Sequence, residues 1–247
     1  MGNTILYILL ISFMATLIRS TFGFGESLIA VPLFILFLPV EVAVPLSVLL
    51  SIAIALVVVI QDHKKIHFKS ARWLLAFALP GIPIGLLILV YGNEQLVKTG
   101  LGLLIVLYSL YALFGKKSIH LQRDSMFWLF ICGFLSGILG GAYGVNGPPL
   151  TIYGNMRRWS AGHFRATLQA YFLPASLIGV AGYGVQGLIT TTVWTDFLIA
   201  LPAVIPAIFL GRYLNRRLKD DAFFRYVYGG LLLIGAFLAC TAGAAGH

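Results

Sequence analysis

Charged residues are scarce in this sequence. Asp, Glu, Lys and Arg together make up 10% of the 247 residues, while 60% are hydrophobic and the mean hydropathy is +0.95. Because soluble domains carry about 25% charged residues, the composition excludes a protein built mainly of soluble domains. Apolar runs of about 20 residues recur along the chain, and each is long enough to cross a bilayer as a helix. We therefore predict an all-α integral membrane protein.

Cysteine is also rare, and its two copies, Cys132 and Cys240, both lie in apolar runs. They supply neither a disulfide framework nor a zinc-binding spacing. His63 and His67 have i, i+4 spacing, but they lie in a basic loop without a further ligand, so we expect no metal site. The sequence has no P-loop, no His-Glu-x-x-His motif and no acid pair typical of a membrane hydrolase. We predict a protein that is not an enzyme and has no cofactor.

Acidic residues are outnumbered by basic ones, 8 to 17. The basic residues lie in short loops between apolar runs rather than on one soluble surface, which is the pattern of cytoplasmic loops in membrane proteins. We therefore expect the lipid bilayer, and not nucleic acid, to be the partner of these charges. The four basic loops are 64–72, 116–123, 157–165 and 212–219. If all four face the cytoplasm of a bacterial inner membrane, both termini lie outside the cytoplasm.

The two halves of the chain resemble each other in the order of their segments. Gly25 aligns with Gly144, and each lies in a glycine-rich interruption that precedes an apolar helix containing proline. We predict an N-terminal transmembrane repeat over residues 1–115, a cytoplasmic linker over 116–124, and a C-terminal repeat over 125–241. Each repeat has about five hydrophobic segments. With every basic loop on one side, the two repeats must have inverted topology.

Two further matches support the repeat. Ala78-Leu79-Pro80 corresponds to Ala200-Leu201-Pro202. Later in each half there is one further corresponding segment, and both of these segments begin with an acidic residue. In the first half we expect Trp73 to Tyr91 to form a single span. In the second half the last span is expected at Phe223 to Cys240.

Both repeats contain an interruption at membrane depth, at Gly23–Ser27 and at Gly140–Pro149. Broken or re-entrant backbone is tolerated there only when it is buried in protein or lines a cavity. A new helix starting near Ser27 or Asn146 directs unpaired N–H groups toward that cavity, which favours an anion. The alternative is that these glycines only let helices pack closely. The residues expected to contact a substrate at the two breaks are Gly25, Glu26, Ser27, Gly144, Asn146, Gly147 and Pro148.

Ionisable and polar side chains beside the breaks extend this candidate site. Arg19 could hold an anionic substrate, and Glu26 could carry a coupling proton or pair with Arg19, since charges within a membrane are costly and commonly functional. Alternatively, Arg19 lies near the surface and extends to lipid headgroups. Arg165 and Gln169 are one helical turn apart and could face the cavity, although an ordinary cytoplasmic anchor is the favoured role for Arg165.

At the two breaks the sequence resembles the sulfite exporter TauE/SafE family, also called the toluene-sulfonate uptake permeases. The resemblance is carried by Gly23 to Leu33 and by Gly137 to Leu150, followed by Arg165 to Gln169, and it extends over nearly the whole chain. It implies secondary transport of small sulfur-containing anions such as sulfite, sulfonates and sulfoacetate. This chain has Glu26-Ser27 where the family commonly continues with glycines, and Val145-Asn146 where the family usually has small residues.

The resulting hypothesis is a secondary transporter that works by alternating access around a site between two broken helices. Its predicted partner is a small sulfur-containing anion, and coupling to a proton or ion gradient is compatible with the sequence. A passive anion channel or a carrier of a small carboxylate are the alternatives. Assembly as a homo-oligomer is left open by the sequence.

Overall fold

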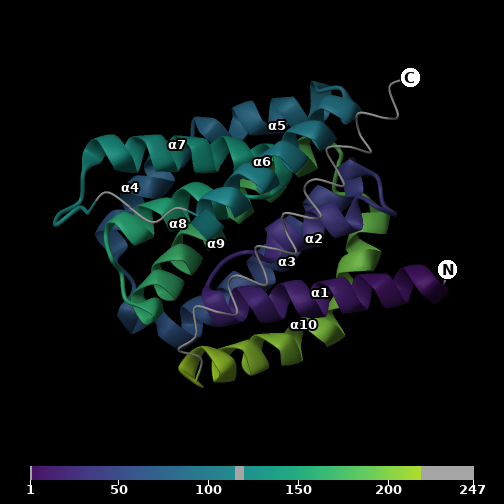
Figure 1. The fold of residues 1–247 in the computed structure, drawn as a ribbon. Coiled ribbons are helices and arrows are strands. Elements are labelled where there is room, and N and C mark those ends of the chain that lie inside the picture. The colour runs from purple at the N-terminus through teal and green to yellow at the C-terminus, as the bar shows by residue number, and fades with distance from the viewer. Residues whose placement is uncertain (1, 115–119, 218–247) are drawn as a thin grey trace.

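A computed structural model describes residues 2–114 and 120–217 of the chain. Within those residues the chain forms ten α-helices and one 3-10 helix, with no strand (Figure 1). The elements are α1 (Gly2–Phe22), α2 (Glu26–Phe34), α3 (Val40–Asp62), η1 (His63–Lys65), α4 (Phe68–Ala78), α5 (Gly81–Tyr91), α6 (Glu94–Phe114), α7 (Met126–Tyr143), α8 (Gly147–Met156), α9 (Ala161–Val185) and α10 (Thr191–Arg217). The segment predicted at Phe223 to Cys240 lies outside the described residues.

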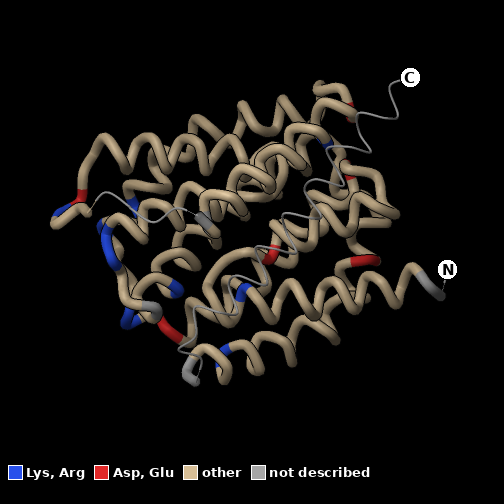
Figure 2. The backbone as a smooth tube through the Cα atoms, viewed as in Figure 1, with Lys and Arg blue, Asp and Glu red and all other residues tan. Residues whose placement is uncertain are grey.

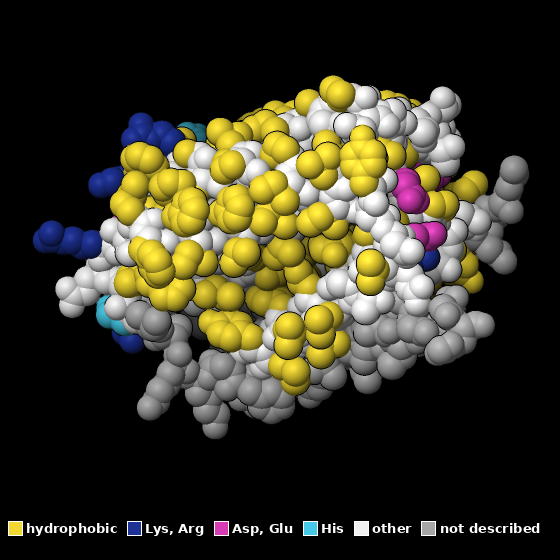
Figure 3. All heavy atoms as spheres, turned by 90° about the horizontal axis from the view of Figure 1, so that it is seen from above, with side chains coloured by type: hydrophobic (Ala, Val, Ile, Leu, Met, Phe, Trp, Pro, Cys, Tyr) yellow, Lys and Arg dark blue, Asp and Glu magenta, His cyan; other side chains and the backbone are white. Residues whose placement is uncertain are grey.

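The helices form a bundle with an apolar exterior. Helices α1, α3, α7, α9 and α10 are long and apolar enough to cross a membrane, and the bent pair α4–α5 is a sixth candidate. Large hydrophobic side chains such as Leu10, Leu103 and Phe209 are exposed on the outside. Figure 3 shows hydrophobic side chains over the visible face, with Lys and Arg mainly at one end. An apolar belt between polar ends suits a bilayer, so the prediction of an all-α membrane protein is confirmed.

Helix α3 runs through the bundle, so the position of a contact along α3 indicates how far from either end of the bundle that contact lies. It begins at Val40 beside the exposed Glu41, and it ends at Asp62, directly before η1 with its residues Lys64 and Lys65. Lys and Arg lie mainly at the end of the molecule where α3 finishes (Figure 2). This end is called the basic end below, and the other is called the N-terminal end because α1 also begins there (Figure 1).

Helices α1 and α2 form a hairpin that opens toward the N-terminal end. After the break at residues 23–25, α2 turns back toward the start of α1 (Figure 1). The ring of Phe37, just after α2, consequently lies 5.7 Å from the ring of Tyr7, near the start of α1. The tip of this hairpin lies inside the bundle.

Helices α7 and α8 form a second hairpin, which opens toward the basic end. Arg157, just after α8, lies 3.0 Å from the carboxylate of Asp124, just before α7. Asp124 also accepts a hydrogen bond from Ser70 of α4, which follows η1 closely in the chain. The two hairpins therefore enter the bundle from opposite ends, and their tips meet inside it (Figure 1).

The span predicted from Trp73 to Tyr91 corresponds to the bent pair α4–α5, so it is not one straight helix but is interrupted after Ala78. Helices α4 and α5 meet at an angle of 46° across Leu79 and Pro80. Proline lacks the N–H that would continue the hydrogen-bond ladder, although α10 passes through Pro202 without a break. The correspondence between Ala78–Pro80 and Ala200–Pro202 is thus one of sequence and does not extend to conformation.

Close backbone packing against α7 accounts for the position of α5. Gly81 and Gly85 of α5 lie against the backbone of α7, and a Cβ atom at either residue would overlap a carbonyl group of α7. On α7, a Cβ atom at Gly133 would lie 2.7 Å from the carbonyl oxygen of Leu74 in α4. Glycines at such contacts let two membrane helices approach through their backbones. The bend lets α4 and α5 both follow the same face of α7.

Candidate functional site

The first predicted break is confirmed at the end of α1. Helix α1 ends at Phe22, and the chain then passes through Gly23 with φ of 90° and Gly25 with φ of 98° before α2 begins at Glu26. These positive φ angles belong to the left-handed region that only glycine adopts without strain. The break at residues 23–25 thus depends on glycine at two defined positions.

The second predicted break is confirmed at the end of α7. Gly144 has φ of 67°, and its N–H donates to the carbonyl of Gly140, while the N–H of Val145 donates to the carbonyl of Leu139. These two bonds satisfy carbonyl groups that the helix end leaves without partners. Helix α8 then begins after Asn146, with prolines in its first turn, as the sequence predicted.

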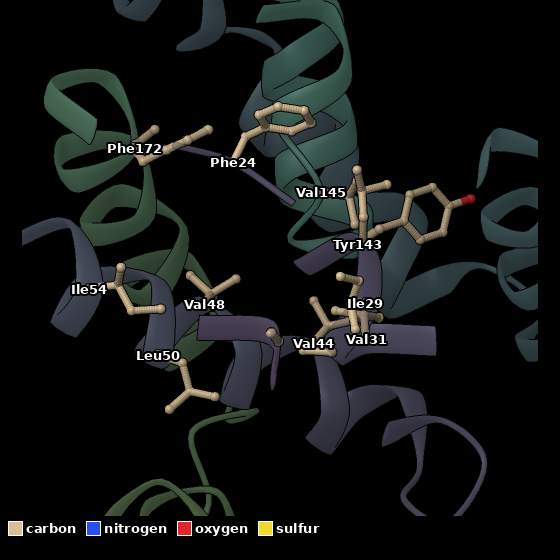
Figure 4. Close-up of a cluster of buried hydrophobic side chains, with 14 of the residues drawn as sticks. Phe24, Ile29, Val31, Val44, Val48, Leu50, Ile54, Tyr143, Val145 and Phe172 are labelled. Carbon is tan, nitrogen blue, oxygen red and sulfur yellow. The ribbon is translucent and has the colours of Figure 1, made fainter. Parts of the chain in front are cut away.

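The two breaks face each other across a small cavity. Its lining consists of Arg19, Phe24, Gly25, Glu26, Ser27, Leu28, Val145, Asn146, Gly147 and Phe172. Figure 4 shows the apolar part of this wall, with Phe24 and Val145 from the two breaks and Phe172 from α9. The cavity volume is about 10 Å³, which is room for roughly one water molecule. In this conformation the cavity is therefore closed to a sulfur oxyanion.

Arg19 is a buried cation at the edge of this cavity and is 3% exposed. Its guanidinium donates to the carboxylate of Glu26 at 3.1 Å, to the hydroxyl of Ser51 at 2.7 Å and to the amide oxygen of Gln169 at 2.8 Å. It also lies 4.6 Å from the ring centre of Phe172. Ser51 is midway along α3, so Arg19 lies at mid-depth. The alternative in which Arg19 extends to lipid headgroups is wrong.

Glu26 is a buried anion at the first residue of α2 and is 1% exposed. One carboxylate oxygen accepts from Arg19 and from the hydroxyl of Ser27 at 2.9 Å. The other oxygen accepts from the hydroxyl of Ser47 at 2.7 Å. The N-terminal end of a helix carries partial positive charge, so the carboxylate occupies the place that an anion would prefer.

Helix α9 holds both breaks in place. Gln169, besides accepting from Arg19, donates its amide N–H to the carbonyl of Gly23 at 2.7 Å. The hydroxyl of Tyr171 lies 2.9 Å from that of Ser136 in α7, and Ser136 donates to the backbone carbonyl of Asn146 at 2.7 Å. Buried backbone carbonyls that lack helical partners are thereby satisfied. Gln169 thus supports the cavity wall from behind.

Arg165 is buried at the basic end of the bundle. It is 2% exposed, and it is not part of the cavity lining. Its guanidinium lies 3.2 Å from Asp62 at the end of α3, and Asp62 also lies 3.4 Å from Arg212 of α10. Arg165 therefore belongs to an ion-pair cluster at the basic end, which ties α3, α9 and α10 together.

The remaining predicted site residues divide between the wall and its support. Gly25, Ser27, Asn146 and Gly147 line the cavity. Gly144 lies behind it, where a Cβ atom would approach the side chain of Val48 to 2.9 Å. Pro148 is also behind the wall, and its carbonyl accepts a hydrogen bond from Thr151 in the next turn of α8.

Four polar or aromatic contacts of this site were missed by the sequence analysis: Ser47, Ser51, Phe172 and Ser176. Ser47 and Ser51 are separated by one helical turn in an otherwise apolar stretch of α3, so both face the same side. The hydroxyls of Ser51 and Ser176 lie 3.1 Å apart. The i, i+4 serine pair in a hydrophobic run was the signal that could have revealed this polar face.

The ring of His67 lies among aromatic side chains. Its ring lies 4.6 Å from that of His163 and stacks on Trp159 at 5.5 Å. Burial of the ring and, secondarily, the imidazole of His163 lower the pKa of His67 below its ordinary value. Among residues 2–114 and 120–217, no group of three His, Cys, Asp or Glu side chains could hold a metal ion.

These features define a class of protein. A multi-pass helical bundle in which two interrupted helices meet at a buried, charged cavity is the architecture of membrane transport proteins. The family profile described as sulfite exporter TauE/SafE matches residues 8–238. The chain belongs to this family, whose name is that of membrane exporters and not of enzymes.

A curated relative comes from Cupriavidus necator and bears the name "Probable sulfite/organosulfonate exporter TauE". It is 29% identical over 170 residues, which are 66% of this chain and 65% of the relative. The match thus covers just under two thirds of the relative's length. No solved structure shows a significant match to the chain.

Proposed function

We propose that this protein is a secondary transporter of small sulfur-containing anions, of the sulfite or organosulfonate type. The observation that carries the proposal is the meeting of two helix breaks at one buried cavity beside Arg19. Two half-helices, α2 and α8, begin at this cavity with Glu26 and Gly147. Their partial positive charges and the guanidinium together favour an anion over a neutral or cationic substrate.

The proposed mechanism is alternating access. The cavity in the closed conformation is too small for a sulfonate, so helices must move apart before substrate enters. The hairpins α1–α2 and α7–α8 open toward opposite ends of α3, as expected for repeats of inverted topology. Movement of one hairpin against the rest of the bundle would open the cavity toward one side of the membrane.

The orientation proposed for the protein follows from its charges. With the basic end in the cytoplasm, helix α1 begins outside the cytoplasm, which agrees with an external N-terminus. The C-terminus is expected on the same side. The proposed location is the bacterial inner membrane, and a homo-oligomeric state is compatible with the exposed apolar surface.

The substrate class is supported by the family and by the chemistry of the cavity. The relative from Cupriavidus necator is named for sulfite and organosulfonates. Arg19, Ser27 and the amide of Asn146 are donors suited to sulfonate oxygens, and Phe24 and Phe172 offer an apolar surface to an organic group. A small carboxylate would find the same donors, and a passive anion channel would share the electropositive helix ends.

Flux into proteoliposomes tests the proposal and separates the alternatives. Purified protein is reconstituted, and uptake of labelled sulfite, methanesulfonate and acetate is followed. Each uptake is measured with and without a pH gradient, and with and without a membrane potential set by potassium diffusion. We expect saturable uptake of sulfite or methanesulfonate above that of acetate, with accumulation against a concentration gradient. Flux that only equilibrates the anion indicates a channel, and preference for acetate indicates a carboxylate carrier. Absence of flux for all three anions contradicts the proposal.

A matched pair of variants tests the position of the site. Asn146→Leu removes a polar group from the cavity wall, whereas Asn155→Leu makes the same change at an exposed position near the end of α8. We expect at least a tenfold loss of uptake in the first variant and nearly unchanged uptake in the second. Equal uptake by two variants that reach the membrane in equal amounts contradicts the assignment of the cavity as the binding site.

A further inference from the structure

Glu26 occupies the position in which the proposed function would place the substrate. Its carboxylate lies at the start of α2 and 3.1 Å from the guanidinium of Arg19, and both residues line the same cavity. With a cavity volume of about 10 Å³, a substrate anion has no room beside Arg19 while Glu26 is seated there. A second negative charge next to an ionised Glu26 would also be repelled strongly in a buried site.

We propose that Glu26 is a resident counter-anion whose protonation admits the substrate, so that one proton accompanies each monoanion through the protein. This inference rests on the proposed transport function and names its coupling ion. The balance of charge is simple. In the closed state Arg19 carries +1 and Glu26 carries −1. In the loaded state the substrate carries −1, Glu26 has taken one proton from solution, and the net charge of the site is again zero.

The surroundings of Arg19 permit this exchange. Without Glu26, the guanidinium keeps its bonds to Ser51 at 2.7 Å and to Gln169 at 2.8 Å, and it keeps its contact with the ring of Phe172. These three neighbours are uncharged and hold Arg19 in place whether or not Glu26 is ionised. The cation therefore remains positioned to receive another anion.

The surroundings of Glu26 permit protonation. Its hydroxyl partners Ser27 and Ser47 donate to the ionised carboxylate at 2.9 and 2.7 Å. A serine hydroxyl both donates and accepts, so Ser47 can accept a hydrogen bond from the protonated carboxyl group. Protonation thus leaves no buried hydrogen-bonding group of Glu26 without a partner.

A single charged side chain, Arg19 of α1, faces Glu26 among the described elements packed around it. Helix α3 contributes the hydroxyls of Ser47 and Ser51, and the break before α8 contributes Asn146. Helix α6, which also packs on α2, contributes Tyr108 against the ring of Phe24. Helix α9 reaches the pair through Gln169 and Phe172.

Binding of methanesulfonate at several pH values provides the test, because this anion does not itself titrate between pH 5 and 8. Wild-type protein, Glu26→Gln and the control Glu41→Gln are compared by thermal shift in detergent. Glu41 is exposed at the start of α3 and is not part of the cavity lining. For wild type and the control we expect the apparent affinity to weaken by up to tenfold per pH unit as pH rises. For Glu26→Gln we expect an affinity that does not depend on pH.

Flux in proteoliposomes gives a second readout. An inward proton gradient should drive methanesulfonate accumulation by wild type, and membrane potential should have little effect because the loaded site is neutral. In Glu26→Gln the proton gradient should lose its effect, and an inside-positive potential should drive uptake instead. Two outcomes overturn this inference but leave the proposed function intact. One is accumulation by wild type that does not depend on the proton gradient. The other is binding by Glu26→Gln that depends on pH in the same way as binding by wild type. Absence of anion binding and flux in every variant at every pH overturns both.

Discussion

The buried pair of Arg19 and Glu26 makes a quantitative prediction about stability. Both side chains are almost fully buried, and the shortest distance between their charged atoms is 3.1 Å. Replacing either residue by Met leaves the other as an uncompensated charge, and breaking a buried ion pair in this way costs roughly 3–5 kcal/mol. The double variant removes both charges and keeps similar side-chain volume. We therefore expect each single variant to be less stable than the double variant.

Thermal unfolding in detergent measures the effect. For a chain of this size a loss of 1 kcal/mol lowers Tm by about 2–4 °C, so each single variant should lose on the order of 10 °C, with the double variant between them and wild type. Because the double variant should lose less than either single variant, the coupling energy from the cycle should exceed the loss in one single variant, which is about 3 kcal/mol or more. Glu94→Met is the control, because the Glu94–Lys98 pair at 2.8 Å is exposed and such pairs contribute about 0–1 kcal/mol. Additive losses in the cycle would refute the reasoning.

Two further predictions concern helix packing and the basic end. Gly137→Val should lower Tm, since a Cβ atom at Gly137 would overlap the carbonyl group of Ala78 and overpacking costs about 1–3 kcal/mol. The control Gly184→Val should leave Tm unchanged, because a Cβ atom there meets no atom within 4 Å. The lowered pKa of His67 means that the folded protein binds this proton more weakly than the unfolded chain. The stability contributed by neutral His67 is therefore full above pH of about 6.5 and is lost as pH falls below it, and His67→Phe should make Tm between pH 7.5 and 5.5 less dependent on pH.

The contrary outcomes are equally specific. An unchanged Tm for Gly137→Val, in protein shown to be folded, contradicts the close contact between α4 and α7. An equal loss of Tm on acidification in wild type and in His67→Phe contradicts the contribution assigned to this imidazole.

Backbone features of the site could be predicted from the sequence because they depend on residue types with restricted roles. Positive φ angles at Gly25 and Gly144 follow from glycine in an apolar run that must turn. The start of α8 after Asn146, with Pro148 in its first turn, follows from the same local chemistry. These signals are local, so one sequence contains them.

Side-chain partners could not be predicted, because they depend on contacts between distant segments. The bond from Arg19 to Gln169 joins residues 150 positions apart, and no local pattern selects that pair. Arg165 was expected to be a cytoplasmic anchor because it lies near a basic loop, but its burial and its ion pair with Asp62 were not predicted. The bend at Pro80 was equally hidden, because Pro202 occupies an unbroken helix.

One face of α9 makes the two halves of the chain depend on each other. Gln169, Phe172 and Ser176 lie along that face, and through them the second half of the chain supplies contacts to Arg19 and Ser51 of the first half. A protein that lacked α9 would bury this arginine without those contacts. We therefore do not expect the first half of the chain to fold stably by itself.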